Sequence, residues 1–231
     1  ATYVAAQSVG EELTGDPNAQ FVFLKLFTAS KGVLPPFVSF ISFLGPLVGL
    51  ALGFDAISRE RVGRTLSRVL SQPVFRDSVI NGKFLAGLAT ISIMLVSIVL
   101  IVSGLGMRLL GVFPESQESY RVIAFVLVTV LYIGFWMSLA ILFSVLFRQT
   151  ATSALAGIAV WIFFAVFMSI IAGLVADGVA PLGEDPTVDV QLKHERTIQF
   201  VERLSPTTLY SEATTTLLTP SVRTLGPVLV K

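Results

Sequence analysis

Residues 122–176 read VIAFVLVTVLYIGFWMSLAILFSVLF-RQT-ATSALAGIAVWIFFAVFMSIIAGLVA, two apolar runs separated by Arg148, Gln149 and Thr150. Neither run contains Asp, Glu, Lys or Arg, each of which costs about 2.5–3.5 kcal/mol at the centre of a bilayer. A helix needs about 20 apolar residues to cross about 30 Å of hydrocarbon, and both runs exceed that length. The stretch therefore predicts two membrane spans, 122–147 and 151–176, joined by a tight turn.

Two further uncharged runs, 33–54 and 84–107, have the same character. Over the whole chain of 231 residues, 54% are hydrophobic and 13% are charged, whereas soluble domains carry about 25% charged residues. This composition excludes a disordered tail and a nucleic-acid-binding protein, and it disfavours a soluble enzyme whose helices are merely buried. We therefore expect an all-α, polytopic membrane protein whose transmembrane domain, residues 33–176, has four spans.

Several kinds of chemical site are excluded by composition. The chain has no cysteine, so disulfides, thiol catalysis and zinc–thiolate sites are excluded. His194 is the single histidine, and we expect it on a solvated surface. The absence of charges within the spans argues against a proton-coupled transporter, a voltage sensor and an intramembrane protease. We expect no catalytic residue, no metal and no cofactor in this chain.

The basic residues predict the orientation in the membrane. Residues 55–83 and 148–150 together carry seven of the 16 Lys and Arg residues, so the positive-inside rule places the 55–83 loop in the cytoplasm. Residues 1–32 and 177–231 then lie outside. An external segment at the start of the chain leads us to expect one more span before residue 1, and the end of the chain another after residue 231.

The outer segments contain short helical patterns. Residues 21–27 are apolar but too short to span, so they either lie in the interface as an amphipathic element or pack against the spans. Residues 192–204 have helical periodicity, and Ser205 followed by Pro206 predicts an N-cap and a first-turn proline of a helix that ends near Leu218. We therefore expect residues 177–231 to form a small external helical cap.

The first span carries Gly45, Gly49 and Gly53 at intervals of four. This spacing puts the three glycines on one helix face, where another helix backbone can approach closely. Packing within the chain and a seam between two copies are both compatible with the pattern.

The loop between the first two spans contains an amphipathic helix. An apolar stripe includes Ile57, Val62, Leu66 and Leu70, while arginines occupy the other sides until Pro73 ends the pattern. Such a helix either lies on anionic headgroups or is presented to a cytosolic protein.

The loop reads RERVGRTLSRVLSQPVFRDSVINGKFLAG over residues 59–87, and it resembles the first cytoplasmic loop of ABC-2 type ABC transporter permeases. The residues that carry the resemblance are Glu60, Arg61, Gly63, Arg64, Thr65, Leu66, Leu70, Ser71, Pro73, Arg76, Gly82 and Lys83. Leu204-Ser205-Pro206 with Leu209-Tyr210 further resembles the subgroup related to the nitrous-oxide-reductase maturation permease.

The resemblance implies a subunit with six spans in the plasma membrane of a prokaryote. It implies a second permease copy and separate ATP-binding subunits, which would hold the ATP and magnesium. The loop helix would be the coupling helix: Leu66 and Leu70 would fill a cleft of the ATPase, and Glu60, Arg61 and Arg64 would set the register by ion pairing. The chain has no Gly-x-x-x-x-Gly-Lys-Ser/Thr motif, so we expect it not to be the ATPase itself.

We therefore predict a permease subunit of an ATP-driven exporter that contacts membrane lipid and binds no nucleic acid. One alternative keeps the family, but the subunit transmits force through residues 177–231 to an external partner protein during metalloenzyme maturation. A second alternative is a structural membrane subunit unrelated to ABC transporters, whose basic loop binds only lipid.

Overall fold

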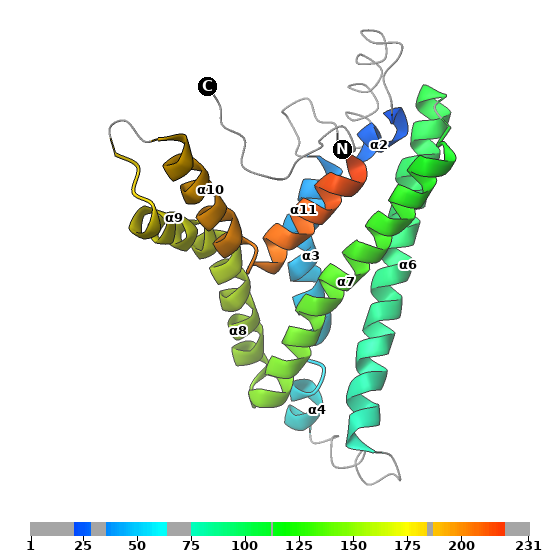
Figure 1. Cartoon of the computed structure of the whole chain (residues 1–231). Coiled ribbons are helices and arrows are strands. Elements are labelled where there is room, and N and C mark those ends of the chain that lie inside the picture. The colour runs from blue at the N-terminus through cyan, green and yellow to red at the C-terminus, as the bar shows by residue number, and fades with distance from the viewer. Residues whose placement is uncertain (1–20, 29–35, 64–74, 112, 184–186, 220–231) are drawn as a thin grey trace.

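The computed structural model describes residues 21–28, 36–63, 75–111, 113–183 and 187–219, and every regular element in these ranges is a helix. Figure 1 shows how they are arranged. In chain order the helices are α2 (Val22–Thr28), α3 (Phe37–Gly53), α4 (Ser58–Val62), α6 (Arg76–Leu110), α7 (Ser116–Leu146), α8 (Thr150–Ile162), the π-helix η1 (Phe163–Phe167), α9 (Met168–Val179), α10 (Val188–Glu202) and α11 (Pro206–Leu218).

Four helical stretches are long and apolar enough to cross a membrane. They are Phe37–Val62, Asp77–Leu109, Ser116–Leu146 and Thr150–Val179. Each covers most or all of one of the apolar runs, so the prediction of an all-α, multi-pass membrane protein is confirmed. The second span is longer than its apolar run because polar residues continue the helix: α6 already begins at Arg76 and ends at Leu110, followed by the C-cap Gly111, whose φ of 67° is the left-handed conformation typical of a helix C-terminus.

The centre of the fold is α7, the most buried of the four spans. Its closest neighbour is α3, whose glycine face lies directly against it. A Cβ atom added to Gly49 would lie 2.5 Å from the carbonyl oxygen of Ile133, and one added to Gly53 would lie 2.6 Å from that of Met137. The backbones of α3 and α7 therefore touch, and Gly45 continues the same face. The glycine series serves packing within one chain.

The short helix α2 packs against the spans. Phe23, Leu24, Leu26 and Phe27 are all at most 2% exposed, and Leu26 fills the space left by Gly106 of α6. Of the two alternatives for residues 21–27, an interfacial element or packing against the spans, the structure shows packing against the spans.

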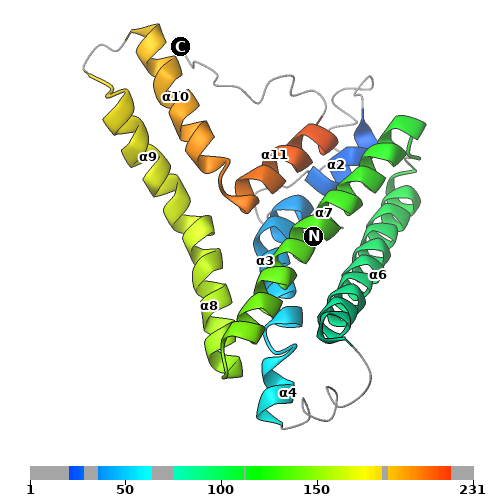
Figure 2. The same ribbon diagram turned by 60° about the horizontal axis from the view of Figure 1, so that its bottom comes forward.

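The last two described helices turn back into the bundle. Figures 1 and 2 show α10 running back along α9 and α11 then crossing α7. At the corner between them, the Ser205 hydroxyl donates to the carbonyl oxygen of Phe164 at 3.3 Å. Phe164 lies in η1, near the middle of the fourth candidate span, Thr150–Val179. Both predicted helices are present, and they pack directly against the spans, α10 on α9 and α11 on α7.

Two details of this region differ from the expectations. His194 is buried, with 6% of its surface exposed, and its Nδ1 atom lies 2.9 Å from the carbonyl oxygen of Ala180. The prediction of a solvated histidine was wrong because α10 folds back on α9 and covers this ring. Ser205 occupies the N-cap position of α11, and Pro206 opens the helix as expected, but the serine hydroxyl makes no capping bond because it binds Phe164.

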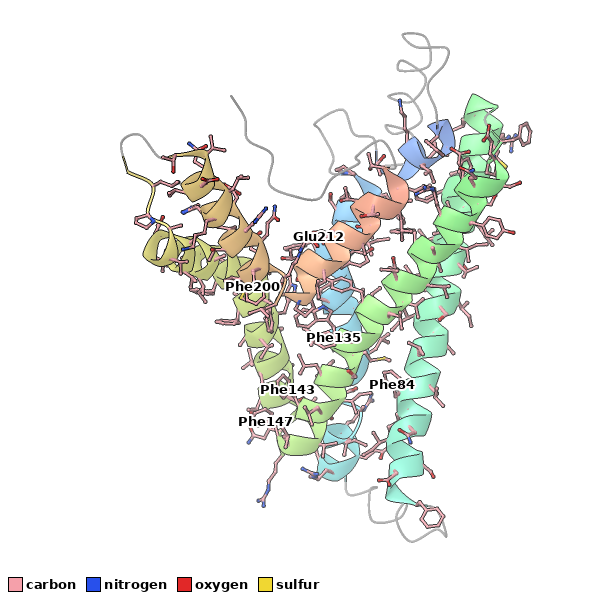
Figure 3. The ribbon with its side chains drawn as sticks, viewed as in Figure 1. Phe84, Phe135, Phe143, Phe147, Phe200 and Glu212 are labelled. Atoms are coloured by element: carbon pink, nitrogen blue, oxygen red, sulfur yellow. The ribbon has the colours of Figure 1, made fainter. Side chains whose placement is uncertain are left out.

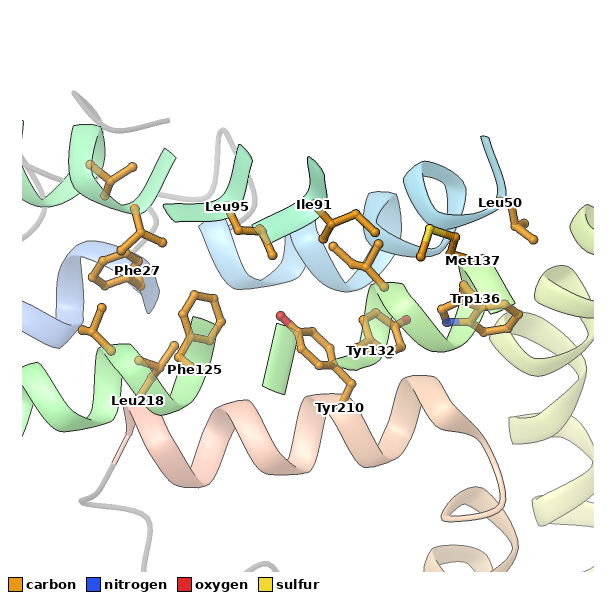
Figure 4. Close-up of a cluster of buried hydrophobic side chains, with 14 of the residues drawn as sticks. Phe27, Leu50, Ile91, Leu95, Phe125, Tyr132, Trp136, Met137, Tyr210 and Leu218 are labelled. Atoms are coloured by element: carbon orange, nitrogen blue, oxygen red, sulfur yellow. The ribbon is translucent and has the colours of Figure 1, made fainter. Parts of the chain in front are cut away.

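A buried polar contact holds α11 against the spans. The rings of Tyr132 and Tyr210 stack with centroids 4.1 Å apart, as Figure 4 shows. The Tyr132 hydroxyl donates to the carbonyl oxygen of Ser42 in α3, and the Tyr210 hydroxyl lies 3.0 Å from Thr129 Oγ1. At the end of α11, the Arg121 guanidinium donates to the carbonyl oxygens of Thr216 and Leu217. In the middle of α11, Glu212, labelled in Figure 3, pairs with Arg203, which precedes the helix, at 3.0 Å.

Candidate functional site

The segment between the first two spans forms a junction of four helices. α4 follows α3 after a short turn, and it lies where α7 ends and α8 begins, at the opposite end of the molecule from α2 (Figures 1 and 2). We call residues 54–63, with the side chains that hold them, the α4 junction. It is built from contacts to α7, α6 and α8, described in that order.

Ser144 of α7 binds the beginning of α4. Its Oγ atom accepts hydrogen bonds from the backbone N–H groups of Ile57 and Ser58, both at 2.9 Å. It also donates to Ser58 Oγ at 3.2 Å. A serine hydroxyl has one donor hydrogen and two acceptor lone pairs, so the Ser144 hydroxyl is fully used. Because Ser144 and Ser58 are both 0% exposed, water does not compete for these bonds.

A second link to α7 comes from Arg61. Its Nη2 atom donates to the carbonyl oxygen of Val145 at 3.3 Å. The last carbonyl groups of a helix have no partner within it, and an arginine is well suited to bind them. The end of α7 is thus joined to α4 twice, by the Ser144 hydroxyl and by the Arg61 side chain.

An ion pair connects α4 to α6. Glu60 Oε1 lies 2.7 Å from Lys83 Nζ, and the two side chains are 25% and 31% exposed. An open hollow of about 460 Å³ borders the pair, lined by Asp55, Ala56, Arg59, Glu60, Gly63 and Lys83. Water in this hollow screens the pair on one side, so we expect it to contribute less than the buried bonds of Ser144.

The remaining contacts are weaker. Ser58 Oγ lies 3.4 Å from Thr150 Oγ1, at the first residue of α8. Arg59 approaches Asp55 at 3.5 Å, but its side chain is 82% exposed, and exposed pairs of this kind contribute about 0–1 kcal/mol. Arg59 is therefore a solvent-facing charge on the outer side of α4.

The structure brings together only some of the residues singled out in the sequence. Glu60, Arg61 and Lys83 belong to the α4 junction, Gly63 follows α4 as its C-cap, and Arg76 is the first residue of α6. A Cβ atom added to Gly82 would meet no other atom within 4 Å, so no close helix contact explains that glycine. The other predicted coupling residues lie outside the described residues: Arg64, Thr65, Leu66, Leu70, Ser71 and Pro73.

Glu60 and Arg61 have partners within the chain. The resemblance implies that both pair with an ATPase, which stays a prediction; in this structure Glu60 pairs with a lysine of α6 and Arg61 donates to a carbonyl oxygen of α7. Their place is on the side of α4 that faces the spans. Of the charged residues described in α4, Arg59 is the one directed to solvent.

Sequence reasoning missed Ser144 entirely. Other serines in the spans, including Ser92, Ser97 and Ser138, donate to carbonyl groups of their own helices, and the sequence does not distinguish Ser144 from them. Its role depends on a turn more than 80 residues away. In the part of the chain that the structure describes, no three His, Cys, Asp or Glu side chains are grouped as metal ligands would be.

Comparison with known proteins gives two findings. A family model described as ABC-2 family transporter protein matches residues 2–226. The chain is also similar to the "Probable ABC transporter permease protein NosY" of Pseudomonas aeruginosa, with 28% identity over 149 residues. This match covers 62% of the chain and 52% of that relative, so the chain spans about half the length of the curated relative it matches.

Proposed function

Because this chain belongs to the ABC-2 family of transporter proteins, we propose that it is the membrane-spanning permease subunit of an ATP-driven exporter. In this proposal a separate ATPase subunit binds ATP and magnesium and hydrolyses the nucleotide. The permease converts opening and closing of the ATPase into movement of the spans. The chain itself carries out no covalent chemistry.

The α4 junction is the observation that carries this proposal. A docking element transmits movement to the spans only if its contacts with them are not readily replaced by contacts with water. α4 meets this requirement through the buried bonds to Ser144, the Arg61 contact to the end of α7 and the Glu60–Lys83 pair to α6. A force applied to α4 therefore reaches two spans directly.

In this proposal the coupling segment, residues 57–72, has two parts. Glu60 and Arg61 hold α4 to the spans. Leu66 and Leu70 would then supply the apolar surface that enters the ATPase, with Arg59 and Arg64 at its rim. A buried leucine contributes about 1.5–3 kcal/mol, whereas a charge at the rim of an interface contributes about 0–1 kcal/mol, so the leucines would provide most of the docking energy.

The proposal includes an orientation and an assembly. The basic loop 55–83 would face the cytoplasm of a prokaryote, in accordance with the positive-inside rule. A second permease copy would complete the transporter. The exposed apolar side chains on α8 and α9, among them Leu155, Ile170 and Leu174, would contact this copy or membrane lipid.

Force transmission to an external protein is a second candidate function. The observation that favours it is that α10 and α11 are bound to two different spans. Their corner binds the middle of the fourth span through Ser205 and Phe164, and α11 binds the third span through Tyr210 and Thr129. Movement between these spans would displace α10, whose charged outer face includes Asp189, Lys193 and Arg196.

Co-purification of the full-length protein from its native membrane tests the proposal. We expect an ATP-binding subunit to accompany it and the rate of ATP hydrolysis to change when the permease is removed. If this protein binds anionic vesicles through Arg59, Arg64 and Arg68 but no ATPase co-purifies with it, the result would support the lipid-binding alternative instead. An external protein that is retained while no solute moves would favour the second candidate.

A further inference from the structure

Ser144 stands apart from the residues that the resemblance assigns to coupling. It lies at the end of the third span, and its hydroxyl binds the turn that begins α4 through the N–H groups of Ile57 and Ser58. The first N–H groups of a helix have no partner within that helix. Because Ile57 is 6% exposed and Ser58 is 0% exposed, water does not replace the serine if it is lost.

Ser144 also connects α4 to the helix that contacts most of the molecule. α7 packs on α3 through the glycine face, on α6 and α8, and on α11 through Thr129. A displacement of α4 that is passed to α7 therefore reaches every other described span. The Glu60–Lys83 pair reaches only α6 and is partly exposed to water.

We propose that Ser144 is a positioning residue that transmits movement of α4 to the third span. This inference rests on the proposed function, because it presupposes that an ATPase moves α4. The Ser144 hydroxyl holds the beginning of α4 at a fixed distance from α7. Without it, α4 can still receive the ATPase, but its hydrogen-bonded link to the third span is reduced to the Arg61 contact with the carbonyl oxygen of Val145.

The chain offers a matched control on the same helix. Ser138 of α7 is exposed, and its hydroxyl donates only to the carbonyl oxygen of Phe135 within α7. Ser138→Ala therefore removes a serine hydroxyl from α7 without touching the α4 junction. Ser144→Ala and Ser144→Cys are the two test variants, because alanine removes the hydroxyl, whereas cysteine leaves no cavity but replaces the hydroxyl with a larger thiol that is a weak hydrogen-bond acceptor.

The first experiment measures amide hydrogen exchange in the purified full-length protein. In Ser144→Ala and Ser144→Cys, exchange of the amides in residues 55–63 should accelerate about tenfold or more, since the N–H groups of Ile57 and Ser58 lose their acceptor. Ser138→Ala should leave exchange there unchanged. Wild-type protection in both Ser144 variants would overturn the assignment, and this result does not depend on any ATPase.

The second experiment measures coupling in the complex with the co-purifying ATPase. Both Ser144 variants should retain the ATPase and its half-saturating ATP concentration, while the permease-dependent change in ATP turnover falls about tenfold. A role in filling space alone predicts that the cysteine variant behaves like wild type, because it leaves no cavity. Failure of the wild-type protein to bind any ATPase would overturn the proposed function and the inference with it. A bound ATPase that stays fully coupled in the cysteine variant would overturn the inference alone.

Discussion

The carboxylate of Glu118 binds the backbone of Phe23, with 3.0 Å between Oε1 and the amide nitrogen. Its other oxygen accepts the N–H of Glu115, also at 3.0 Å. One side chain thus binds the beginnings of α2 and α7, where helix dipoles favour a negative charge. Glu118 is only 3% exposed, so these two bonds replace the water it has lost.

Glu118→Gln should loosen the contact between α2 and α7. A carboxamide has one acceptor oxygen, so one of the two N–H groups loses its partner at a cost of about 1–3 kcal/mol. We expect a lower melting temperature in detergent and faster proteolysis within residues 21–28. Glu195→Gln, on the exposed side of α10, makes the same change in charge and should melt as wild type does. Equal stability of the two variants would show that the Glu118 carboxylate does not hold α2.

The close packing of the α3 glycine face predicts that alanine substitution destabilises the protein at Gly49 but not at Gly173. Gly49→Ala puts a methyl group 2.5 Å from the carbonyl oxygen of Ile133, so α3 and α7 must separate at a cost of about 1–3 kcal/mol. Gly173→Ala adds the same methyl group where no atom lies within 4 Å. Thermal unfolding in detergent should therefore show a loss for the first variant only, and equal melting would contradict the close packing.

The hydrogen bond between Tyr210 and Thr129 has a defined direction. The Thr129 hydroxyl donates to the carbonyl oxygen of Phe125 at 2.7 Å, so the Tyr210 hydroxyl must donate to Thr129 Oγ1. Burial raises the pKa of Tyr210, which keeps the phenol protonated at neutral pH. A double-mutant cycle with Tyr210→Phe and Thr129→Val should give a coupling energy of about 1 kcal/mol. Tyr120→Phe is the control, because Tyr120 is 74% exposed. Additive effects of the two substitutions in the cycle would show that this hydrogen bond does not stabilise the fold.

The orientation is open to direct labelling, because the chain contains no cysteine. Gln149 lies between α7 and α8, Ser116 begins α7, and both are exposed. In intact cells, Ser116→Cys should react with a membrane-impermeant maleimide, and Gln149→Cys should react only after the membrane is opened. The reverse pattern would place the α4 junction outside the cell, where no ATP-driven subunit could reach it.

The parts of the fold that depend on local sequence were predictable. The four spans follow from uncharged runs long enough for a bilayer, and the start of α11 follows from the fixed φ of Pro206. The contacts that connect these helices were not predictable, because each joins residues far apart in the chain. Nothing in the sequence marks Ser144 or Glu118, and His194 was expected on a solvated surface; their roles appear only when the fold brings Ser58, Phe23 and Ala180 beside them.

The same limit applied within the α4 junction. The loop pattern identified Glu60, Arg61 and Lys83, but it did not show that their partners lie within the chain. A charge on an amphipathic helix has the same sequence signature whether it faces a partner protein or its own spans. The structure separates these cases for the three charged residues, while Leu66 and Leu70 lie outside the described residues and stay the predicted docking residues.

Leu66→Asp, studied in the full-length complex, tests the central claim most directly. This change removes the apolar contact and adds a charge that an apolar cleft cannot accommodate, whereas Arg68→Ala removes only a rim charge. Pull-down and ATPase assays in detergent should show that Leu66→Asp loses the ATPase subunit or its permease-dependent turnover, while Arg68→Ala stays within about fivefold of wild type. Wild-type binding and wild-type turnover in Leu66→Asp would contradict the proposal that residues 57–72 couple this permease to an ATPase.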